Sequence, residues 1–161
     1  MAFAHALGRM GSNAIKPLMT EYGSSIDPAR RSFILYALGK IKSAEIVEAL
    51  ALALKAAESP SLELRDTATC VLGKFSESIP PSRLSEQARR MCIEKLQKNL
   101  ADPNPSIRSK AVRSLGKLAK HNHLSEDERA KLESTCRLLL GKDENFEWDR
   151  AYIVRKEAGK H

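Results

Sequence analysis

The sequence predicts an all-α fold, arranged as a solenoid of about four to five stacked helical hairpins. The first observation behind this prediction is an internal repeat, in which a Leu-Gly or Ala-Gly pair and a basic residue close a stretch with helical spacing of apolar residues. The glycines of these pairs are Gly8, Gly39, Gly73, Gly116 and Gly159. They lie 31 to 43 residues apart, a period typical of proteins whose repeats bury their apolar faces only against neighbouring repeats. The second observation is that no segment shows the alternating pattern of a strand.

The helices that end at these glycines have recognisable starts and one apolar face. A polar residue precedes proline at three expected starts, which are Asp27-Pro28, Ser59-Pro60 and Asn104-Pro105. This order favours a helix start, because proline has no N–H to satisfy in the first turn. Apolar or small residues then lie five and one before the glycine, with an apolar residue two after it in four repeats, as a buried helix face requires. An arginine lies eight residues before the glycine in three repeats, at Arg31, Arg65 and Arg108.

The segments between these helices supply the second helix of each hairpin. We expect those helices at residues 13–22, 44–57, 85–101 and 125–141. Ser125 and Glu128 have the spacing of a capping box, in which each side chain bonds to the backbone N–H of the other residue. The hairpins form a single domain at residues 1–161, with units at approximately 1–23, 24–57, 58–101, 102–141 and 142–161.

Composition excludes several classes of protein. Hydrophobic residues make up 42% and charged residues 29% of the 161 residues, which excludes a disordered chain. The most apolar stretch, residues 49–57, is short and contains Lys55, so we expect no membrane span. Three cysteines, Cys70, Cys92 and Cys136, are too scattered for a disulfide framework or a paired zinc site. With no signal peptide visible, we expect a cytoplasmic protein.

Two repeats carry a longer motif, with Asp and Pro at the start, then an arginine, an alanine and Leu-Gly-Lys. Its residues are Asp102, Pro105, Ile107, Arg108, Ala111, Leu115, Gly116 and Lys117, and Asp27, Pro28, Arg31, Ala37, Leu38, Gly39 and Lys40. This motif resembles the HEAT-repeat superfamily, and more closely its phycobilisome-lyase-like subclass, along nearly the whole chain. The resemblance implies a right-handed α-solenoid whose adjacent repeats are joined by an Asp-Arg ladder in the core. It assigns to that ladder Arg31, Arg65 and Arg108, with Asp27 and Asp102.

Some segments depart from the motif. Residues 59–64 contain no Asp, and in the last repeat Ala151 takes the arginine position eight residues before Gly159. The chain also starts within the second helix of a hairpin. We therefore expect Phe3, Leu7 and Met10 to form an edge that another segment or a partner covers.

No combination of residues indicates catalysis or metal binding. His121 and His123 flank one residue of a loop, where we expect them to be solvated. The chain lacks the His-Glu dipeptides through which HEAT-repeat deoxyhypusine hydroxylases bind iron. Trp148, Asp149 and Arg150 are types used by HEAT-like alkylpurine DNA glycosylases, but neighbours on one helix point in different directions. We expect Trp148 to pack within the last repeat, and we predict that the chain is not an enzyme and has no cofactor or metal.

A row of basic residues is the sharpest functional feature. The residue after the glycine is basic in every repeat, so stacking aligns Arg9, Lys40, Lys74, Lys117 and Lys160 along one ridge. Lys110, Arg113 and Lys120 extend it in the fourth repeat at helical spacing. By the HEAT resemblance the ridge faces the concave groove, although a lysine there belongs to the subclass motif whatever the ligand. The predicted partner-binding residues are Arg9, Tyr36, Lys40, Lys74, Lys110, Arg113, Lys117 and Lys120.

Three functions fit these observations. A formal net charge of +7 favours an acidic partner, so the leading hypothesis is a scaffold or adaptor that binds a protein or peptide with an acidic surface. The alternative is non-specific nucleic-acid binding through the ridge. Tyr36 is the one aromatic residue on the ridge, which argues against stacking of single-stranded bases. The third hypothesis, from the resemblance, is a phycobilin lyase-type subunit. The sequence does not specify the oligomeric state.

Overall fold

The computed structural model describes residues 6, 11–142 and 147–161. Its α-helices are α2 (Ile15–Ser24), α3 (Pro28–Leu38), α4 (Leu50–Ala56), α5 (Leu62–Ser78), α6 (Glu86–Asn99), α7 (Pro105–Lys120), α8 (Glu126–Leu139) and α9 (Tyr152–Ala158). Short 3₁₀ helices cover Gly11–Ala14, Ala44–Ala49 and Pro81–Arg83. Strand pairing within the described residues is limited to one bridge between Leu140 and Trp148. The predicted all-α solenoid is confirmed, and none of the described helices is long and apolar enough to cross a bilayer.

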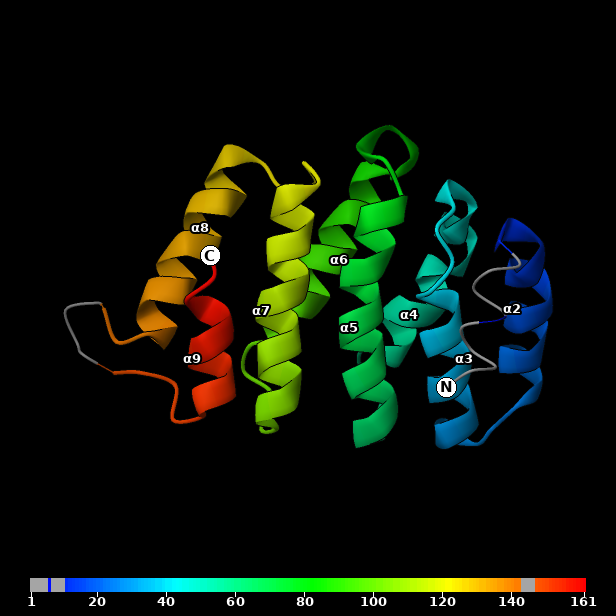
Figure 1. Ribbon diagram of the computed structural model, residues 1–161, viewed down its shortest axis with the longest axis horizontal. Helices are drawn as coiled ribbons and strands as arrows, with labels where there is room; N and C mark the ends of the chain where they lie inside the picture. The colour runs from blue at the N-terminus through cyan, green and yellow to red at the C-terminus, as the bar shows by residue number, and fades with distance from the viewer. Residues whose placement is uncertain (1–5, 7–10, 143–146) are drawn as a thin grey trace.

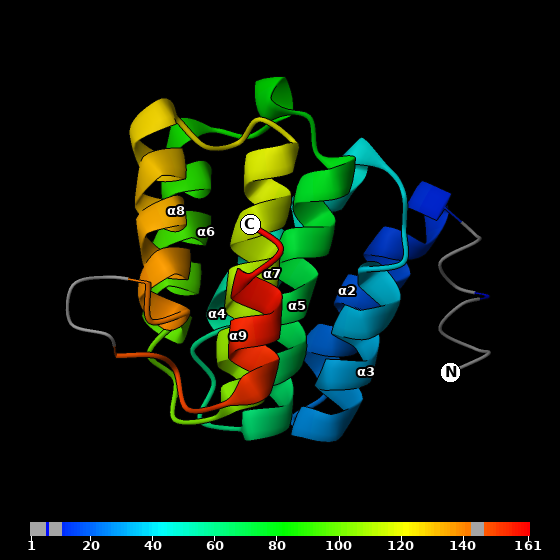
Figure 2. The same ribbon diagram turned by 60° about the vertical axis from the view of Figure 1, so that its left-hand side comes forward.

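The helices stand side by side in two rows (Figure 1). Helices α3, α5, α7 and α9 form an inner row in which neighbours pack closely, and α4, α6 and α8 lie behind them as an outer row (Figure 2). The outer helices contact one another much less, and an open groove of about 650 Å³ lies between α4 and α6. Because one row is tightly packed and the other is splayed, we infer that the solenoid curves toward the inner row.

Most helix starts follow the capping chemistry that the sequence contains. Asp27 caps α3 and Asn104 caps α7, each with proline as the first helical residue, and the predicted capping box of α8 is formed. The start of α5 differs from the prediction. This helix begins at Leu62, two residues after Pro60, and the hydroxyl of Ser59 accepts the N–H of Ser61 within the preceding turn, at 3.2 Å.

The repeat glycines serve close helix packing more than helix termination. Gly73 and Gly116 lie inside α5 and α7, so the expectation that they close their helices is wrong. A Cβ atom at Gly73 would lie 2.5 Å from Oγ of Ser114 on α7, and one at Gly116 would meet the ring of His161. Gly39 does end α3. The glycine period therefore reports where neighbouring inner helices approach each other.

The last repeat has a different register from the predicted one. Nη1 of Arg155 donates to the carbonyl oxygens six and five residues earlier, at 2.7 and 3.0 Å. Nη1 of Arg108 makes the same two bonds, at 2.9 and 3.1 Å. Arg155 is therefore the repeat arginine in place of Ala151. Gly159 follows it by four residues where the earlier repeats have eight, so this glycine has no counterpart in them.

One polar side chain in the core corrects another expectation. His123, expected in solvent, is 2% exposed, and its Nε2 lies 2.9 Å from the carbonyl oxygen of Ser76 on α5. The chain turns sharply at Asn122, where φ is 62°, and the N–H of His123 donates to the carbonyl of Leu118. This turn directs the ring toward α5, where it is buried.

Candidate binding surface on the inner row

A ladder of buried ion pairs joins successive inner helices at their N-terminal ends. Nε of Arg65 donates to Oδ2 of Asp102 at 2.7 Å, and Nε of Arg108 donates to Oδ2 of Asp149 at 2.7 Å. Each arginine also donates to carbonyls in the loop before its own helix. Each guanidinium therefore binds both the loop before its own helix and the aspartate of the next repeat. We call each such arginine–aspartate pair a rung.

Two members of the predicted ladder are placed elsewhere. Asp27 caps the N–H of Ala29 at 3.2 Å, so it contributes no rung. Nε of Arg31 donates to the backbone carbonyl of Tyr22 at 3.3 Å. The guanidinium carbon of Arg31 lies 4.9 Å from the centre of the Tyr22 ring. Its next-repeat partner is missing because Ser59 stands where the later repeats have Asp. Asp149 was missed as a rung; its position six residues before Arg155, like Asp102 before Arg108, could have identified it.

Two lysines flank Tyr36 on the inner row. Nζ of Lys40 lies 4.9 Å and Nζ of Lys74 lies 5.0 Å from the centre of the Tyr36 ring, as in a cation–π contact from each side chain. The side chain of Lys74 crosses the end of α3 at Gly39, where a Cβ atom would lie 3.3 Å from its Cδ. The absence of a side chain at Gly39 thus lets Lys74 of α5 reach the ring of Tyr36 on the neighbouring α3.

The two lysines carry positive charge that the described residues do not neutralise. Among those residues, neither ammonium forms an ion pair with a carboxylate, although the neighbouring cations do. Burial lowers the pKa of Lys74, and the nearby charges of Lys40 and Lys117 lower it further. Cys70, one turn earlier on α5, is half-buried. We call Tyr36, Lys40, Cys70 and Lys74 the inner patch.

Three other predicted partner-binding residues are used to join repeats. Lys110 pairs with Asp66 of α5, Nζ of Lys117 lies 2.7 Å from Oε1 of Glu77, and Nη2 of Arg113 lies 3.0 Å from Oε2 of Glu157. The ridge that looked continuous in sequence is therefore neutralised over much of α7. Sequence reasoning missed these pairs because each carboxylate lies about 40 residues from its lysine or arginine in the chain.

The remaining predicted residues lie apart from this network. Lys120 is exposed at the end of α7, and Arg9 lies outside the described residues. Lys160 pairs with Glu157 at 3.0 Å. Because the register of the last repeat differs from the predicted one, Lys160 does not correspond to Lys40, Lys74 and Lys117. Trp148, expected to pack within that repeat, is 64% exposed, so that expectation is wrong.

Comparisons with known proteins agree with this architecture. The two rows of helices, joined rung by rung, define a helical-repeat solenoid. The HEAT repeat family matches residues 92–122, which include the end of α6 and all of α7. A search of the curated proteins finds no match to the chain.

A solved structure extends the agreement to nearly the whole chain. The chain is similar to the structure of the complex of CpcE and CpcF of phycocyanin lyase from Nostoc sp. PCC7120, with a TM-score of 0.75 and 20% identity. The match covers 98% of this chain and 85% of that chain. The HEAT-repeat resemblance is confirmed by the family match at residues 92–122, and the fold of the chain is similar to that of the phycocyanin lyase complex.

The same comparison corrects the prediction that the chain is not an enzyme. That prediction came from the absence of a recognisable catalytic set in the sequence. The matching fold belongs to a phycocyanin lyase complex. This fold therefore occurs in an enzyme, although the sequence of this chain shows no recognisable catalytic set. The inventory is therefore no ground for excluding an enzymatic role.

Proposed function

We propose that the chain is a protein-binding module that uses the inner patch to hold a carboxylate-bearing segment of a partner protein. The observation that carries this proposal is the pair of ammonium groups of Lys40 and Lys74 around Tyr36, which have no carboxylate among the described residues. A partner carboxylate would offset the burial, and the repulsion from Lys40 and Lys117, that lower the pKa of Lys74. The solved structure with the same fold is a complex of two proteins, which supports a protein partner.

The two helices that carry the inner patch are tied to each other. Oγ of Ser32 on α3 lies 2.6 Å from Oγ1 of Thr67 on α5, and Lys42, just after α3, pairs with Glu77 of α5 at 3.2 Å. The inner patch therefore keeps its geometry before a partner arrives, which reduces the entropy lost on binding. Lys110, Arg113, Lys117 and Lys120 remain proposed contributors, as does Arg9, which lies outside the described residues. We also retain the proposed unit limits and a cytoplasmic location.

Partner recovery with matched variants tests the proposal. The double variant Lys40→Gln, Lys74→Gln removes the two unpaired charges, and Lys16→Gln, Lys131→Gln removes two exposed charges from α2 and α8. We expect one specific, nuclease-resistant partner to be recovered by the wild type and the second variant and lost with the first. Loss of recovery after nuclease treatment, or equal recovery by both variants, would contradict the proposal. Thermal unfolding of both variants checks that they remain folded.

A second candidate function is a subunit of a phycobilin lyase-type complex. The fold match over 98% of this chain favours it. If this candidate is right, adding a phycobilin should produce a saturable change in its visible absorption, and substitution in the inner patch should reduce that change. A spectrum unchanged by the protein at every ratio would reject this candidate while leaving the protein-binding proposal in place.

A further inference from the structure

Helix α9, the last helix described, repeats half of a ladder rung. Arg65 and Arg108 use Nη1 for carbonyls of their own loops, and they use Nε and Nη2 for the aspartate of the next repeat. Arg155 makes the first set of bonds, at 2.7 and 3.0 Å. Its Nε and Nη2 receive no acceptor among the described residues. The guanidinium therefore presents the same edge that holds an aspartate in the two preceding rungs.

The next position on α9 follows the same logic. Lys156 corresponds to Asp66 on α5 and Ser109 on α7. Asp66 accepts a hydrogen bond from Ser106 in the next repeat at 2.8 Å, and Ser109 donates to the carbonyl of Ile153 in the next repeat at 3.3 Å. Lys156 is exposed and forms no ion pair within the described part of the chain. Arg155 and Lys156 thus occupy two adjacent positions whose counterparts on α5 and α7 bind the following repeat, and both side chains are cationic.

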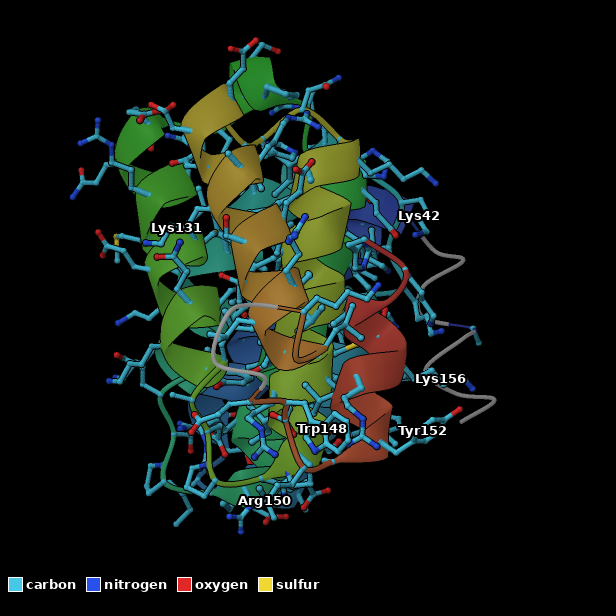
Figure 3. All side chains as sticks on the ribbon, turned by 90° about the vertical axis from the view of Figure 1, so that its left-hand side faces the viewer. Lys42, Lys131, Trp148, Arg150, Tyr152 and Lys156 are labelled. Atoms are coloured by element: carbon cyan, nitrogen blue, oxygen red, sulfur yellow. The ribbon has the colours of Figure 1, made fainter. Side chains whose placement is uncertain are left out.

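Exposed aromatic rings lie beside these cations. Trp148 is 64% and Tyr152 is 67% exposed, and their ring centres lie 5.4 and 6.0 Å from the Arg155 guanidinium carbon. Figure 3, which looks onto this end, shows Trp148 and Tyr152 together at the start of α9 and Lys156 farther along the helix. We call Trp148, Tyr152, Arg155 and Lys156 the end face. Large exposed rings around an arginine are typical of the centres of protein interfaces.

We propose that the end face docks a partner protein through the start of a helix that carries an aspartate three residues before its first turn. In the two existing rungs, Asp102 lies three residues before α7 and Asp149 lies three residues before α9. A partner aspartate in that position continues the ladder by accepting from Nε and Nη2 of Arg155. Acidic groups in the first turn of the partner helix meet Lys156, and the aromatic rings cover its apolar side.

A second copy of this chain fits the end face less well. The position six residues before the repeat arginine is Ser25 before α3 and Ser59 before α5. Neither residue supplies the carboxylate that Arg155 lacks. The missing carboxylate favours a different acidic protein as the occupant, and the end face is separate from the inner patch.

Fluorescence of Trp148 provides a local readout of docking, because it is the only tryptophan in the chain. The probe is a synthetic peptide that begins Asp-Pro-Asn-Pro, as in residues 102–105, and continues as an Ala-, Glu- and Leu-containing helix without aromatic residues. Its control carries Asn in place of the leading Asp. We expect a saturable change in emission, with the control peptide binding about tenfold more weakly, as the loss of a bidentate charge-assisted pair implies.

Matched protein variants assign that difference to the rung. Arg155→Gln should bind the Asp and Asn peptides equally, whereas Arg150→Gln, which removes an exposed arginine of the same loop, should keep the tenfold ratio. Should Arg155→Gln unfold, Lys156→Gln still tests the end face, because it should weaken both peptides alike. Equal affinity of the two peptides for the wild type, or no emission change at millimolar peptide, would overturn the proposal. So would a change in emission with protein concentration alone, which would indicate self-association.

Discussion

Arginines and lysines of similar appearance in the sequence have different roles in this molecule. Arg65 and Arg108 are largely buried and paired with aspartates of the next repeat, as the HEAT resemblance implied for the two arginines but not for Asp149. Lys40 and Lys74 lie beside an aromatic ring without a carboxylate among the described residues. The difference depends on which residue the stacking brings opposite each cation, and the functional proposals rest on that difference.

Removing a ladder arginine should destabilise the fold. We expect Arg65→Ala and Arg108→Ala each to lower the free energy of unfolding by about 3 kcal/mol, because Asp102 or Asp149 is left buried without its partner. Arg90→Ala is the control, since the Arg90–Glu86 pair is exposed and should cost at most about 1 kcal/mol. Urea midpoints measure all three. Equal midpoints for ladder and control variants would show that the ladder does not join the repeats.

The ladder should also make stability depend on pH. Hydrogen bonds from Arg108 hold the pKa of Asp149 below its ordinary value despite partial burial of the carboxylate. A lowered pKa in the folded state means that the stabilisation is complete above the unfolded pKa of about 4, and it is lost as pH falls through the folded value. The stability difference between wild type and Asp149→Asn should therefore shrink as pH falls below about 4.

Exposed Asp127 supplies the control for this pH dependence, because it forms no ion pair among the described residues. Urea midpoints of wild type, Asp149→Asn and Asp127→Asn are compared between neutral and strongly acid pH. The curve of Asp127→Asn should run parallel to the wild type throughout. A constant difference between wild type and Asp149→Asn at every pH would contradict the role given to the rung.

At the scale of helices, the repeat glycines set the spacing of the inner row. Gly73→Ala should destabilise the protein by about 1 to 3 kcal/mol, because the new Cβ would fall 2.8 Å from Cα of Ser114 and force α5 and α7 apart. Gly23→Ala on α2 meets open space and should be neutral or stabilising by up to about 1 kcal/mol. Thermal unfolding separates the two outcomes. A stabilised Gly73→Ala would mean that α5 and α7 are not in close contact there.

The order of the helices was predicted from periodicity and caps, but the register of the last repeat was not. Asp27 and Asn104 marked the starts of α3 and α7 because capping depends on residues a few positions apart. Gly159 misplaced the last repeat, because a glycine after a short helix looks the same whether it caps that helix or contacts a neighbour. The Asp149 to Arg155 spacing was the better guide, since the rung requires it.

The candidate site was predicted only in part for a related reason. Tyr36, Lys40 and Lys74 were placed on one surface by the repeat alone, and the structure brings them together. The pairing of Lys117 with Glu77 depends on how one repeat stacks on the next, which no local pattern encodes. His123 became buried through a turn at Asn122 that the sequence did not reveal.

At the scale of the whole molecule, the ion pairs between repeats limit the basic surface. The net charge is +7, but Lys110, Arg113 and Lys117 are largely neutralised by carboxylates of adjacent repeats. Reversing these three charges should therefore weaken contacts between α5, α7 and α9. A surface with few unpaired cations should bind a duplex weakly at physiological salt.

The central claim is that the inner patch binds protein carboxylates in preference to phosphates. The most direct measurement compares the affinity of a defined Asp- and Glu-containing peptide with that of a random DNA duplex, at physiological salt. We expect the wild type and Lys16→Gln, Lys131→Gln to bind the peptide, Lys40→Gln, Lys74→Gln to lose it, and the duplex to bind weakly to all three. Tighter binding of the duplex than of the peptide by the wild type, with a log-log salt slope of about −0.9 per phosphate neutralised, would contradict the claim.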